Sequence, residues 1–280
     1  MLKILQARWH QGHRTVAYPA QEPTLPERFV GQPSLQPAKC PQGCSECVAA
    51  CPTGAITVDA TGPSLDQGRC LYCTECSDAC PHDAIHFTRE YRLAARTRSD
   101  LIVRDQTGPR AAALSDKLRR LFGRSLKLRQ VSAGGCNACE SDLNVLGTVV
   151  FDLGRFGIQF VASPRHADGL VITGPVTENM KLALEKTYKA IPSPKIVIAV
   201  GACGISGGPY IGHREVCGGA DSVVPVDLYI PGCPPHPFTI LDGLLRLIGK
   251  IEDDVASGGS WAAKSAANRL ASAQTLDRGE

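Results

Sequence analysis

The cysteines constrain this chain most, because eight of its thirteen form two copies of one spacing pattern. Each copy is a run of four cysteines followed by a proline: Cys40, Cys44, Cys47, Cys51 and Pro52, then Cys70, Cys73, Cys76, Cys80 and Pro81. From Cys44 onward the first copy recurs 29 residues later, and the recurrence includes Ala55 and Ile56 as Ala84 and Ile85. The sequence therefore predicts an internal duplication that folds with approximate two-fold symmetry.

The spacing C-x2-C-x2-C-x3-C-P is typical of a cubane iron-sulfur cluster. Three thiolates of one tight loop bind three irons, and the fourth cysteine binds the neighbouring cluster. No secretory signal precedes these cysteines, so we expect a cytosolic chain whose thiols serve metal or redox chemistry rather than disulfides. The pattern predicts two ligand sets: Cys40, Cys44, Cys47 and Cys80 for cluster 1, and Cys70, Cys73, Cys76 and Cys51 for cluster 2.

Two points stay open at this stage. The first copy has three residues between Cys40 and Cys44, where the pattern has two, so Cys40 is the least secure of the eight ligands. Zinc knuckles are the alternative, since C-x2-C pairs also bind zinc tetrahedrally. Zinc sites, however, need neither the third evenly spaced cysteine nor the proline that follows the fourth.

These motifs carry a family resemblance. Residues 38–88 resemble a bacterial two-cluster ferredoxin, and the alternation in AITVDA and AIHFT predicts the short strands that flank its clusters. Upstream, Tyr18-Pro19 and the segment ERFVGQP at 27–33 resemble the ferredoxin-type subunits of respiratory complex I and of formate hydrogenlyase.

A second domain is expected from about Leu114. The segment at 115–123 has helical apolar spacing and ends at Gly123, and the segment at 125–133 alternates as a strand does. Further strands are predicted at 168–176, 195–204 and 221–232, with helices at 178–191 and 238–250. Val- and Ile-rich strands alternating with helices favour a parallel sheet covered on both faces. The predicted class is therefore α/β: a ferredoxin-like α+β domain, then a flavodoxin-like parallel-sheet domain.

Four more cysteines follow the predicted strands of this second domain: Cys136, Cys139, Cys203 and Cys233. In parallel sheets, functional residues gather in the loops beyond the carboxyl ends of the strands, so these thiols are expected at one edge. Glycines around them, such as Gly201 and Gly232, let backbone amides approach the sulfurs. Four thiolates fit a third [4Fe-4S] cluster.

Four segments of the second domain carry a further resemblance: GGCNACE, ADGLVITGPVTENM, VIAVGACGISGG and VPVDLYIPGCPPHP. They resemble the small subunit of [NiFe] hydrogenases and the related 20 kDa subunit of complex I. The complex I subunit has two adjacent cysteines, whereas Asn137 and Ala138 separate Cys136 from Cys139 here, which is the hydrogenase arrangement. The resemblance implies a membrane-bound hydrogenase of the formate hydrogenlyase type. In that family the ferredoxin-like part is usually a separate chain, so the fusion is a departure.

Three other residues are considered individually: Glu140 and His236 each have two interpretations, and Cys217 has one. Glu140 resembles an acidic residue that would pass protons near the large subunit, or is a glutamate favoured by the start of a helix. His236 would donate a hydrogen bond to a cluster sulfur, or is an ordinary loop histidine. Cys217 belongs to no motif and is interpreted as a free thiol.

Charge and composition set the domain limits. We divide the chain into an extended segment (1–37), a dicluster domain (38–88), a connector (89–119), a hydrogenase-like domain (120–254) and a mobile tail (255–280). Residues 89–129 carry a net charge of +8, from twelve Lys or Arg against four Asp or Glu, and the flanking parts are negative. A solvated connector competes with a docking site for an acidic partner or lipid. Stacking aromatics are not interleaved with the cations, so nucleic acid is not expected.

The expected function is electron transfer, because the cofactors do the chemistry and the protein sets their spacing. The expected cofactors are three [4Fe-4S] clusters. The resemblance implies as partners a [NiFe] hydrogenase large subunit or a complex I 49 kDa-like subunit, membrane-arm subunits, and a donor such as ferredoxin or formate dehydrogenase. No apolar run reaches the 18 residues of a membrane span, so we expect a cytoplasmic chain held peripherally on the membrane by its partners. A quinone-reducing complex I-like subunit and a zinc-binding redox sensor or scaffold are the alternatives.

Overall fold

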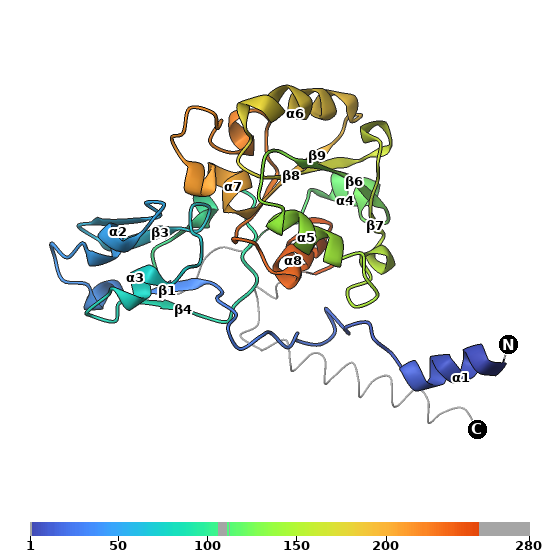
Figure 1. Ribbon diagram of the computed structural model, residues 1–280, viewed down its shortest axis with the longest axis horizontal. Coiled ribbons are helices and arrows are strands. Elements are labelled where there is room, and N and C mark those ends of the chain that lie inside the picture. The colour runs from blue at the N-terminus through green and yellow to red at the C-terminus, as the bar shows by residue number, and fades with distance from the viewer. Residues whose placement is uncertain (1, 106–110, 112, 252–280) are drawn as a thin grey trace.

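The computed structural model describes residues 2–105, 111 and 113–251, which form a smaller and a larger body side by side (Figure 1). The predicted mobile tail lies outside the described residues, as do several residues of the predicted connector. Within the described residues, no helix combines the length and the apolar character that crossing a bilayer requires.

The larger body is built on a five-stranded sheet whose neighbouring strands are all parallel. In spatial order the strands are β10 (Leu228–Ile230), β9 (Ile196–Val200), β8 (Gly169–Thr173), β6 (Leu126–Ser132) and β7 (Ile158–Phe160). Numbered along the chain and read from β7, the order is 2-1-3-4-5, which is the flavodoxin-like order. The predicted flavodoxin-like sheet is confirmed.

Helices cover both faces of this sheet. The alternation of β9 shows why: Ile196, Ile198 and Val200 pack into one apolar cluster, and Val197 and Ala199 pack into another. The first cluster contains residues of α5 (Ala138–Val145) and α8 (Pro237–Leu247), and the second contains residues of α6 (Glu178–Ala190) and α7 (Gly201–Ser206). A short helix, α4 (Asp116–Phe122), precedes β6 and ends at Gly123 as predicted.

The strand predicted over 221–232 is shorter than expected. Only Leu228–Ile230 pairs with the sheet, and residues Ala220–Ser222 form a 3-10 turn. Pro225 lies between these two elements, and proline has no amide N–H to donate to a strand neighbour.

Every residue of α8 is buried, including two that carry charge. Asp242 lies one helical turn before Arg246, whose Nε donates to Asp242 Oδ2 over 2.7 Å. The hydroxyl of Tyr18 donates to the other carboxylate oxygen, also over 2.7 Å. A charge buried without such partners would be costly, so this network allows α8 to be central to the core.

The smaller body contains the duplicated cysteine motifs, and its elements repeat as the sequence predicts. Helices α2 (Glu46–Ala50) and α3 (Glu75–Asp78) are each followed by a strand, β2 (Ile56–Asp59) or β4 (Ile85–Phe87). Strand β4 pairs antiparallel with β1 (Pro33–Leu35), and β2 pairs antiparallel with β3 (Gly62–Asp66). The strand–helix–strand unit therefore occurs twice, as β1–α2–β2 and β3–α3–β4, and the strands predicted from AITVDA and AIHFT are confirmed.

The N-terminal segment differs from its predicted extended form, because residues Leu2–Gln11 form helix α1. These residues are mostly good helix formers, such as Leu, Ala, Gln and Arg. The following residues run along the larger body, where the amide of Val16 donates to Val150 O and the guanidinium of Arg155 donates to the carbonyls of Val16 and Tyr18.

The predicted connector is partly folded into both bodies. Strand β5 (Ile102–Val103) extends the β2–β3 sheet, and Ala95 forms an antiparallel bridge with Tyr229 of β10. Several of its cations have internal carboxylate partners: Arg92 contacts Glu90, Arg98 contacts Asp66, and Arg104 contacts Asp59. These contacts favour the structural interpretation of this part of the positive charge.

Candidate metal centres

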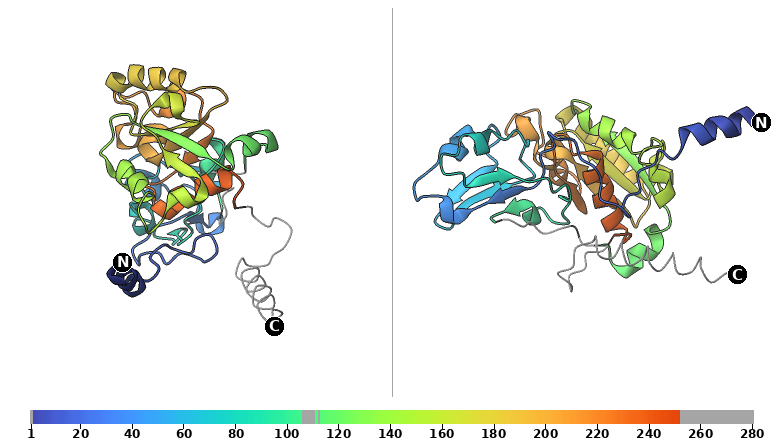
Figure 2. Two further views of the ribbon diagram at one scale, coloured as in Figure 1. Left: turned by 90° about the vertical axis from the view of Figure 1, so that its right-hand side faces the viewer. Right: turned by 90° about the horizontal axis from the view of Figure 1, so that it is seen from below.

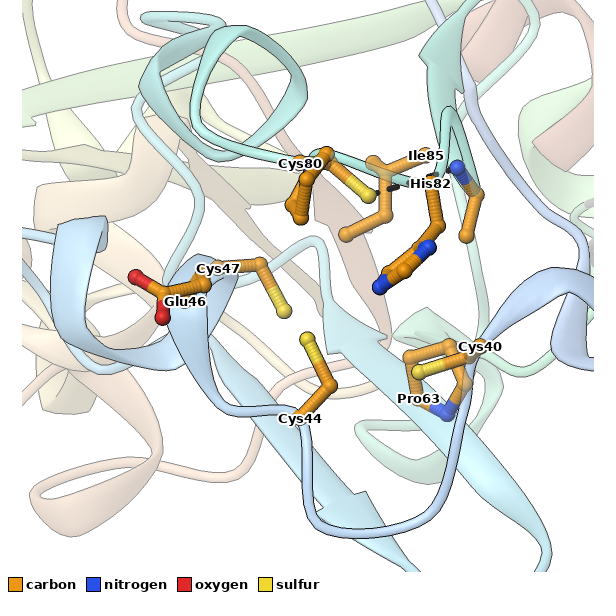
Figure 3. A pocket seen from close by; sticks show the side chains of 10 residues that line it. Cys40, Cys44, Glu46, Cys47, Pro63, Cys80, His82 and Ile85 are labelled. Atoms are coloured by element: carbon orange, nitrogen blue, oxygen red, sulfur yellow. Dashed lines mark hydrogen bonds between the residues drawn. The ribbon is translucent and has the colours of Figure 1, made fainter.

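Four thiols of the smaller body line one pocket, which we call site 1: Cys40, Cys44, Cys47 and Cys80. Figure 3 shows their side chains around a common space, with Cys40 and Cys44 on the loop between β1 and α2, Cys47 in the first turn of α2, and Cys80 just after α3. Burial raises the pKa of the Cys47 thiol, and the nearby thiols of Cys80, Cys40 and Cys44 raise it further. The structure thus brings together all four residues predicted for cluster 1.

A second pocket, site 2, repeats this arrangement with Cys51, Cys70, Cys73 and Cys76. Here the loop between β3 and α3 supplies Cys70 and Cys73, the first turn of α3 supplies Cys76, and the C-cap of α2 supplies Cys51. Burial raises the pKa of Cys70 to about 12 and that of Cys76 to about 12, and neighbouring thiols add to both shifts. Each pocket therefore takes its fourth thiol from the other copy of the motif, as the spacing predicts.

Backbone amides point at three of these sulfurs. The donor–sulfur pairs are Ala55 N to Cys51 Sγ (3.2 Å), Tyr72 N to Cys70 Sγ (3.3 Å) and Ala84 N to Cys80 Sγ (3.3 Å). The donors to Cys51 and Cys80 are equivalent residues of the two copies. An N–H donor favours the thiolate form that binds iron, so both pockets have the donor chemistry a [4Fe-4S] cluster requires.

The strand registers locate the extra residue of the first motif. Leu35 lies opposite Ile85, and its counterpart Leu65 lies opposite Ile56. Cys40 follows Leu35 by five residues, the same interval that separates Cys70 from Leu65, so Cys40 and Cys70 occupy equivalent places. The insertion is therefore confined to the loop from Cys40 to Cys44, where Gly43 adopts a positive φ of 84° and a Cβ would meet no atom within 4 Å.

The third group, site 3, lies at the carboxyl edge of the parallel sheet. Cys136 and Cys139 follow β6, Cys203 lies in α7 directly after β9, and Cys233 follows β10. Burial raises the pKa of Cys203 to about 11, and the thiols of Cys233 and Cys136 raise it as well. The pKa of Cys139 is also raised, first by burial and then by Glu140 and the other three thiols. The four predicted cysteines therefore share one region.

Two glycines make room for these thiols. A Cβ on Gly201 would lie 2.5 Å from the sulfur of Cys139, and a Cβ on Gly208 would lie 2.8 Å from the sulfur of Cys203. Gly201 also has a φ of +83°, which side-chain-bearing residues rarely adopt. The close approach expected from the sequence is present at Gly201, which leads from β9 into α7.

Among the described residues, no three His, Cys, Asp or Glu side chains converge on a point that could hold one metal ion. A cluster of four irons takes one thiolate per iron, so its four ligands need not approach as closely as those of a single ion. Four thiols around a shared space, with backbone donors at some of the sulfurs, fit that requirement in sites 1 and 2. The four clustered thiols of site 3 fit it as well.

Glu140 is buried beside site 3. Its Oε1 accepts hydrogen bonds from Ser132 Oγ and Thr173 Oγ1, both over 2.6 Å. Burial alone raises the pKa of this carboxyl group, but the two hydroxyl donors outweigh it and hold the pKa below its usual range. Glu140 also lies in the first turn of α5, where a negative charge is favoured. Two strand hydroxyls that the sequence analysis did not identify therefore hold the carboxyl group in place and favour its ionised form.

His236 is the N-cap of α8, a role that the sequence analysis did not predict. Its Nδ1 accepts the amide N–H of Phe238 over 3.2 Å, so the neutral ring carries its proton on Nε2. The ring stacks on Phe238 and contacts Phe29 edge-on, with centroid distances of 5.5 and 5.4 Å. Burial lowers the pKa of His236, which favours this neutral form.

Cys217 lies outside the three sites. Its thiol contacts Glu178 Oε1 at 3.2 Å, and burial and this carboxylate raise its pKa. No other cysteine in the described part of the chain is among the groups that shift its pKa, and its interpretation as a free thiol stays a prediction.

Sites 2 and 3 meet across the junction of the two bodies. Arg98 forms a two-armed ion pair with Asp66, and Nη1 lies 2.6 Å from Oδ1. A Cβ on Gly68, two residues before Cys70, would lie 2.7 Å from Ile205 of α7 and 2.8 Å from Arg98 Nη1. The thiol of Cys73 is near enough to raise the pKa of Cys233, although burial and Cys136 contribute more.

Comparison with known proteins explains this architecture. Residues 136–247 match the family described as "NADH ubiquinone oxidoreductase, 20 Kd subunit", and residues 39–84 match a "4Fe-4S dicluster domain". The "Probable membrane-bound hydrogenase subunit mbhJ" of Pyrococcus furiosus is 39% identical over 135 residues, which are 48% of this chain and 81% of that protein. The chain belongs to the 20 kDa subunit family of complex I. It is an iron-sulfur electron-transfer subunit of the hydrogenase and complex I-like oxidoreductases, with a dicluster domain in the same polypeptide.

Other relatives of this 20 kDa family member belong to hydrogenase-type and to complex I-type enzymes. "Formate hydrogenlyase subunit 7" of Escherichia coli is 43% identical over 148 residues, or 53% of this chain. The chain spans only 58% of that relative's length. An NADH-quinone oxidoreductase subunit of Heliobacterium modesticaldum is 41% identical over 127 residues, which are 45% of this chain and 73% of that protein.

Proposed function

We propose that this chain relays electrons through three [4Fe-4S] clusters to or from the [NiFe] site of a partner large subunit, in a membrane-bound hydrogenase of the formate hydrogenlyase type. The observation that carries the proposal is that twelve thiols form three groups of four, at sites 1, 2 and 3. In the proposal, Cys40, Cys44, Cys47 and Cys80 hold cluster 1, Cys51, Cys70, Cys73 and Cys76 hold cluster 2, and Cys136, Cys139, Cys203 and Cys233 hold cluster 3.

The choice of a hydrogenase rests on the loop after β6. Asn137, with a φ of +72°, and Ala138 separate Cys136 from Cys139, whereas the complex I subunit it resembles has adjacent cysteines. The relatives from Escherichia coli and Pyrococcus furiosus are named as subunits of a formate hydrogenlyase and a hydrogenase. A quinone-reducing complex I-like subunit is the second candidate, favoured by the 41% identity to a subunit of an NADH-quinone oxidoreductase.

Bound [4Fe-4S] clusters supply one-electron redox chemistry over a wide range of potentials. The chain's own residues determine the order of the sites. Site 2 lies at the junction, where Gly68 approaches Ile205 of α7, and Cys73 is near enough to Cys233 to affect its pKa. We therefore place site 1 at the end where electrons enter or leave, site 2 in the middle and site 3 next to the large subunit.

Residues around site 3 suit contact with a partner. Cys136 and Cys233 are exposed at the carboxyl edge of the sheet, although both belong to the proposed cluster. Covering them with a large subunit would exclude water from the electron-transfer route. Further partners in the proposal are membrane-arm subunits and a donor such as ferredoxin or formate dehydrogenase, with the chain on the cytoplasmic face of the membrane.

The test is Cys136→Ala in the assembled complex, with hydrogen turnover and quinone reduction measured side by side. The proposal predicts loss of hydrogen turnover, because one iron of cluster 3 loses its ligand. Cys217→Ala is the matched control and is expected to leave turnover unchanged, since its thiol lies outside the three sites. Unaltered hydrogen turnover in Cys136→Ala would contradict the proposal, and loss of a quinone reductase activity instead would favour the second candidate.

A further inference from the structure

Helix α1 contributes nothing to the core of either body. None of its residues is buried, and Figures 1 and 2 show it projecting away from the rest of the protein. Its large apolar side chains face solvent: Leu2 is 84% exposed, Ile4 72%, Leu5 66% and Trp9 87%. An isolated helix of this length is marginal in water, so an apolar surface of this kind calls for an external contact.

Three of the four large apolar side chains of α1 share one face, and the fourth, Ile4, lies about 100° from the edge of that face. At about 100° per residue, Leu2, Leu5 and Trp9 fall within an arc of about 60° on one face. Lys3 and His10 lie near the opposite face, and Arg8 lies beside the apolar stripe. A tryptophan next to leucines, with cations at the flanks, is the arrangement of helices that lie in the plane of a membrane interface.

The charge of the surrounding segment has one sign. Lys3, Arg8 and Arg14 precede the first acidic residue, Glu22. Within the part of the chain that the structure describes, none of these three cations forms a salt bridge, and Arg8 Nη1 donates only to the carbonyl of Gly12. The charge is therefore available to an anionic surface.

The helix is tethered at a point with its own exposed apolar residues. Thr15 Oγ1 donates to Val149 O over 2.8 Å, and the amide of Val16 donates to Val150 O over 2.9 Å. The side chains of Val149 and Val150 are 71% and 40% exposed. The apolar surface of α1 and these two valines thus flank the same attachment point on the larger body.

We propose that α1 docks onto a lipid bilayer with anionic headgroups, with Leu2, Leu5 and Trp9 at the acyl boundary and Lys3, Arg8 and Arg14 against the headgroups. The chain then contacts the membrane directly and does not depend on partner subunits alone to reach it. This inference does not rest on the proposed electron-transfer function, because it concerns lipid binding and not the clusters.

The test is co-sedimentation of the full, cluster-loaded chain with vesicles. We expect binding to vesicles of phosphatidylglycerol and phosphatidylcholine, little binding to phosphatidylcholine alone, and release by added salt. The double variant Leu5→Glu/Trp9→Ala, which replaces two of the three residues on the apolar face, is expected to bind vesicles about tenfold or more weakly. Lys3→Gln/Arg8→Gln should weaken binding to the anionic vesicles only.

The matched control is Leu182→Glu on α6. Leu182 is 58% exposed, and its helix α6 lies on the other side of the molecule from α1 (Figure 1), so this variant should bind like the parent. Because α1 buries nothing, all variants should keep the parent's iron content, which shows that they are folded. In a Trp261→Phe background, Trp9 fluorescence should shift to the blue when anionic vesicles are added.

Three results would overturn the proposal. The first is no sedimentation of the parent chain with anionic vesicles. The second is equal loss of binding in the α6 control. The third is normal vesicle binding by the α1 variants together with failure to join a membrane complex, which would make the partner of α1 a protein.

Discussion

The two bodies of this protein collect thiols in opposite ways. In the smaller body, one short loop and the first turn of the helix after it supply three of the four thiols of each site, and the fourth comes from the end of the helix in the other copy. In the larger body, four thiols come from segments that follow three different strands of a parallel sheet. Sites 1 and 2 are thus local features of the chain, and site 3 exists only when the sheet has formed.

This difference indicates which substitutions would disrupt each site. A short cysteine-rich loop tolerates changes elsewhere, because its thiols stay close in sequence. Site 3 depends on backbone positions at the strand ends, above all Gly201, whose Cα lies where no Cβ fits beside Cys139. Changes to the sheet should therefore damage site 3 and spare sites 1 and 2.

The largest expected effect follows from Gly201→Ala. The new Cβ would lie 2.5 Å from Cys139 Sγ, and alanine would also have to adopt a φ of +83°. We expect the variant to lose the iron of site 3, about 4 of about 12 atoms per chain, and to keep the rest. Iron analysis together with EPR of the reduced protein measures this.

The control separates the steric effect from the backbone effect. Gly212 has a similar φ of +79°, but a Cβ there would meet no atom within 4 Å. Gly212→Ala should therefore keep all of the iron. Equal losses in the two variants would mean that backbone strain, and not the approach of Gly201 to Cys139, decides whether site 3 forms.

The next largest effect is on stability. In Asp242→Asn the buried Arg246 loses its carboxylate partner and Tyr18 loses an ionised acceptor, so the free energy of unfolding should fall by about 3–5 kcal/mol. Chemical denaturation of the loaded protein measures the change. Asp59→Asn removes an exposed partner of Arg104 and should alter the midpoint little. A small effect of Asp242→Asn would show that α8 does not depend on this network.

A smaller effect is expected at the junction between the bodies. Arg98→Lys keeps the charge but loses the two-armed contact with Asp66, so sites 2 and 3 should be held less firmly. We expect a weaker and more broadly distributed magnetic coupling between reduced clusters 2 and 3, with iron content unchanged. Arg104→Lys, at the exposed Asp59 pair, is the control. An unchanged magnetic coupling in Arg98→Lys would show that Arg98 does not help to hold sites 2 and 3 in place.

The smallest effect is expected in the local loop of site 1. Gly43→Ala should cost about 1 kcal/mol in the free energy of unfolding, because alanine tolerates a positive φ poorly. A Cβ on Gly43 would face open space, so the four thiols of site 1 should keep their iron. Thermal unfolding and iron analysis of the same sample test both parts. Loss of iron from site 1 would show that the widened loop is as constrained as the sheet edge.

The same contrast explains how far the sequence predicts the structure. Sites 1 and 2 follow from spacing, because their cysteines are neighbours in the chain, and the apolar run of β9 indicates a buried strand. The partners of Asp66, Glu140 and Asp242 could not be predicted, since Arg98, Thr173 and Tyr18 are distant in sequence and meet them only in the folded protein. Strand β7 has only three residues, too few to show a period.

The most direct test of the account is the content of iron, acid-labile sulfide and zinc in the full chain purified without oxygen. Three [4Fe-4S] clusters predict about 12 iron and about 12 sulfide per chain, with no stoichiometric zinc. A colourless protein with stoichiometric zinc would contradict the whole account. About 8 iron and about 8 sulfide, with Cys136, Cys139, Cys203 and Cys233 all reactive toward a thiol reagent, would contradict the claim that the sheet edge builds a third site.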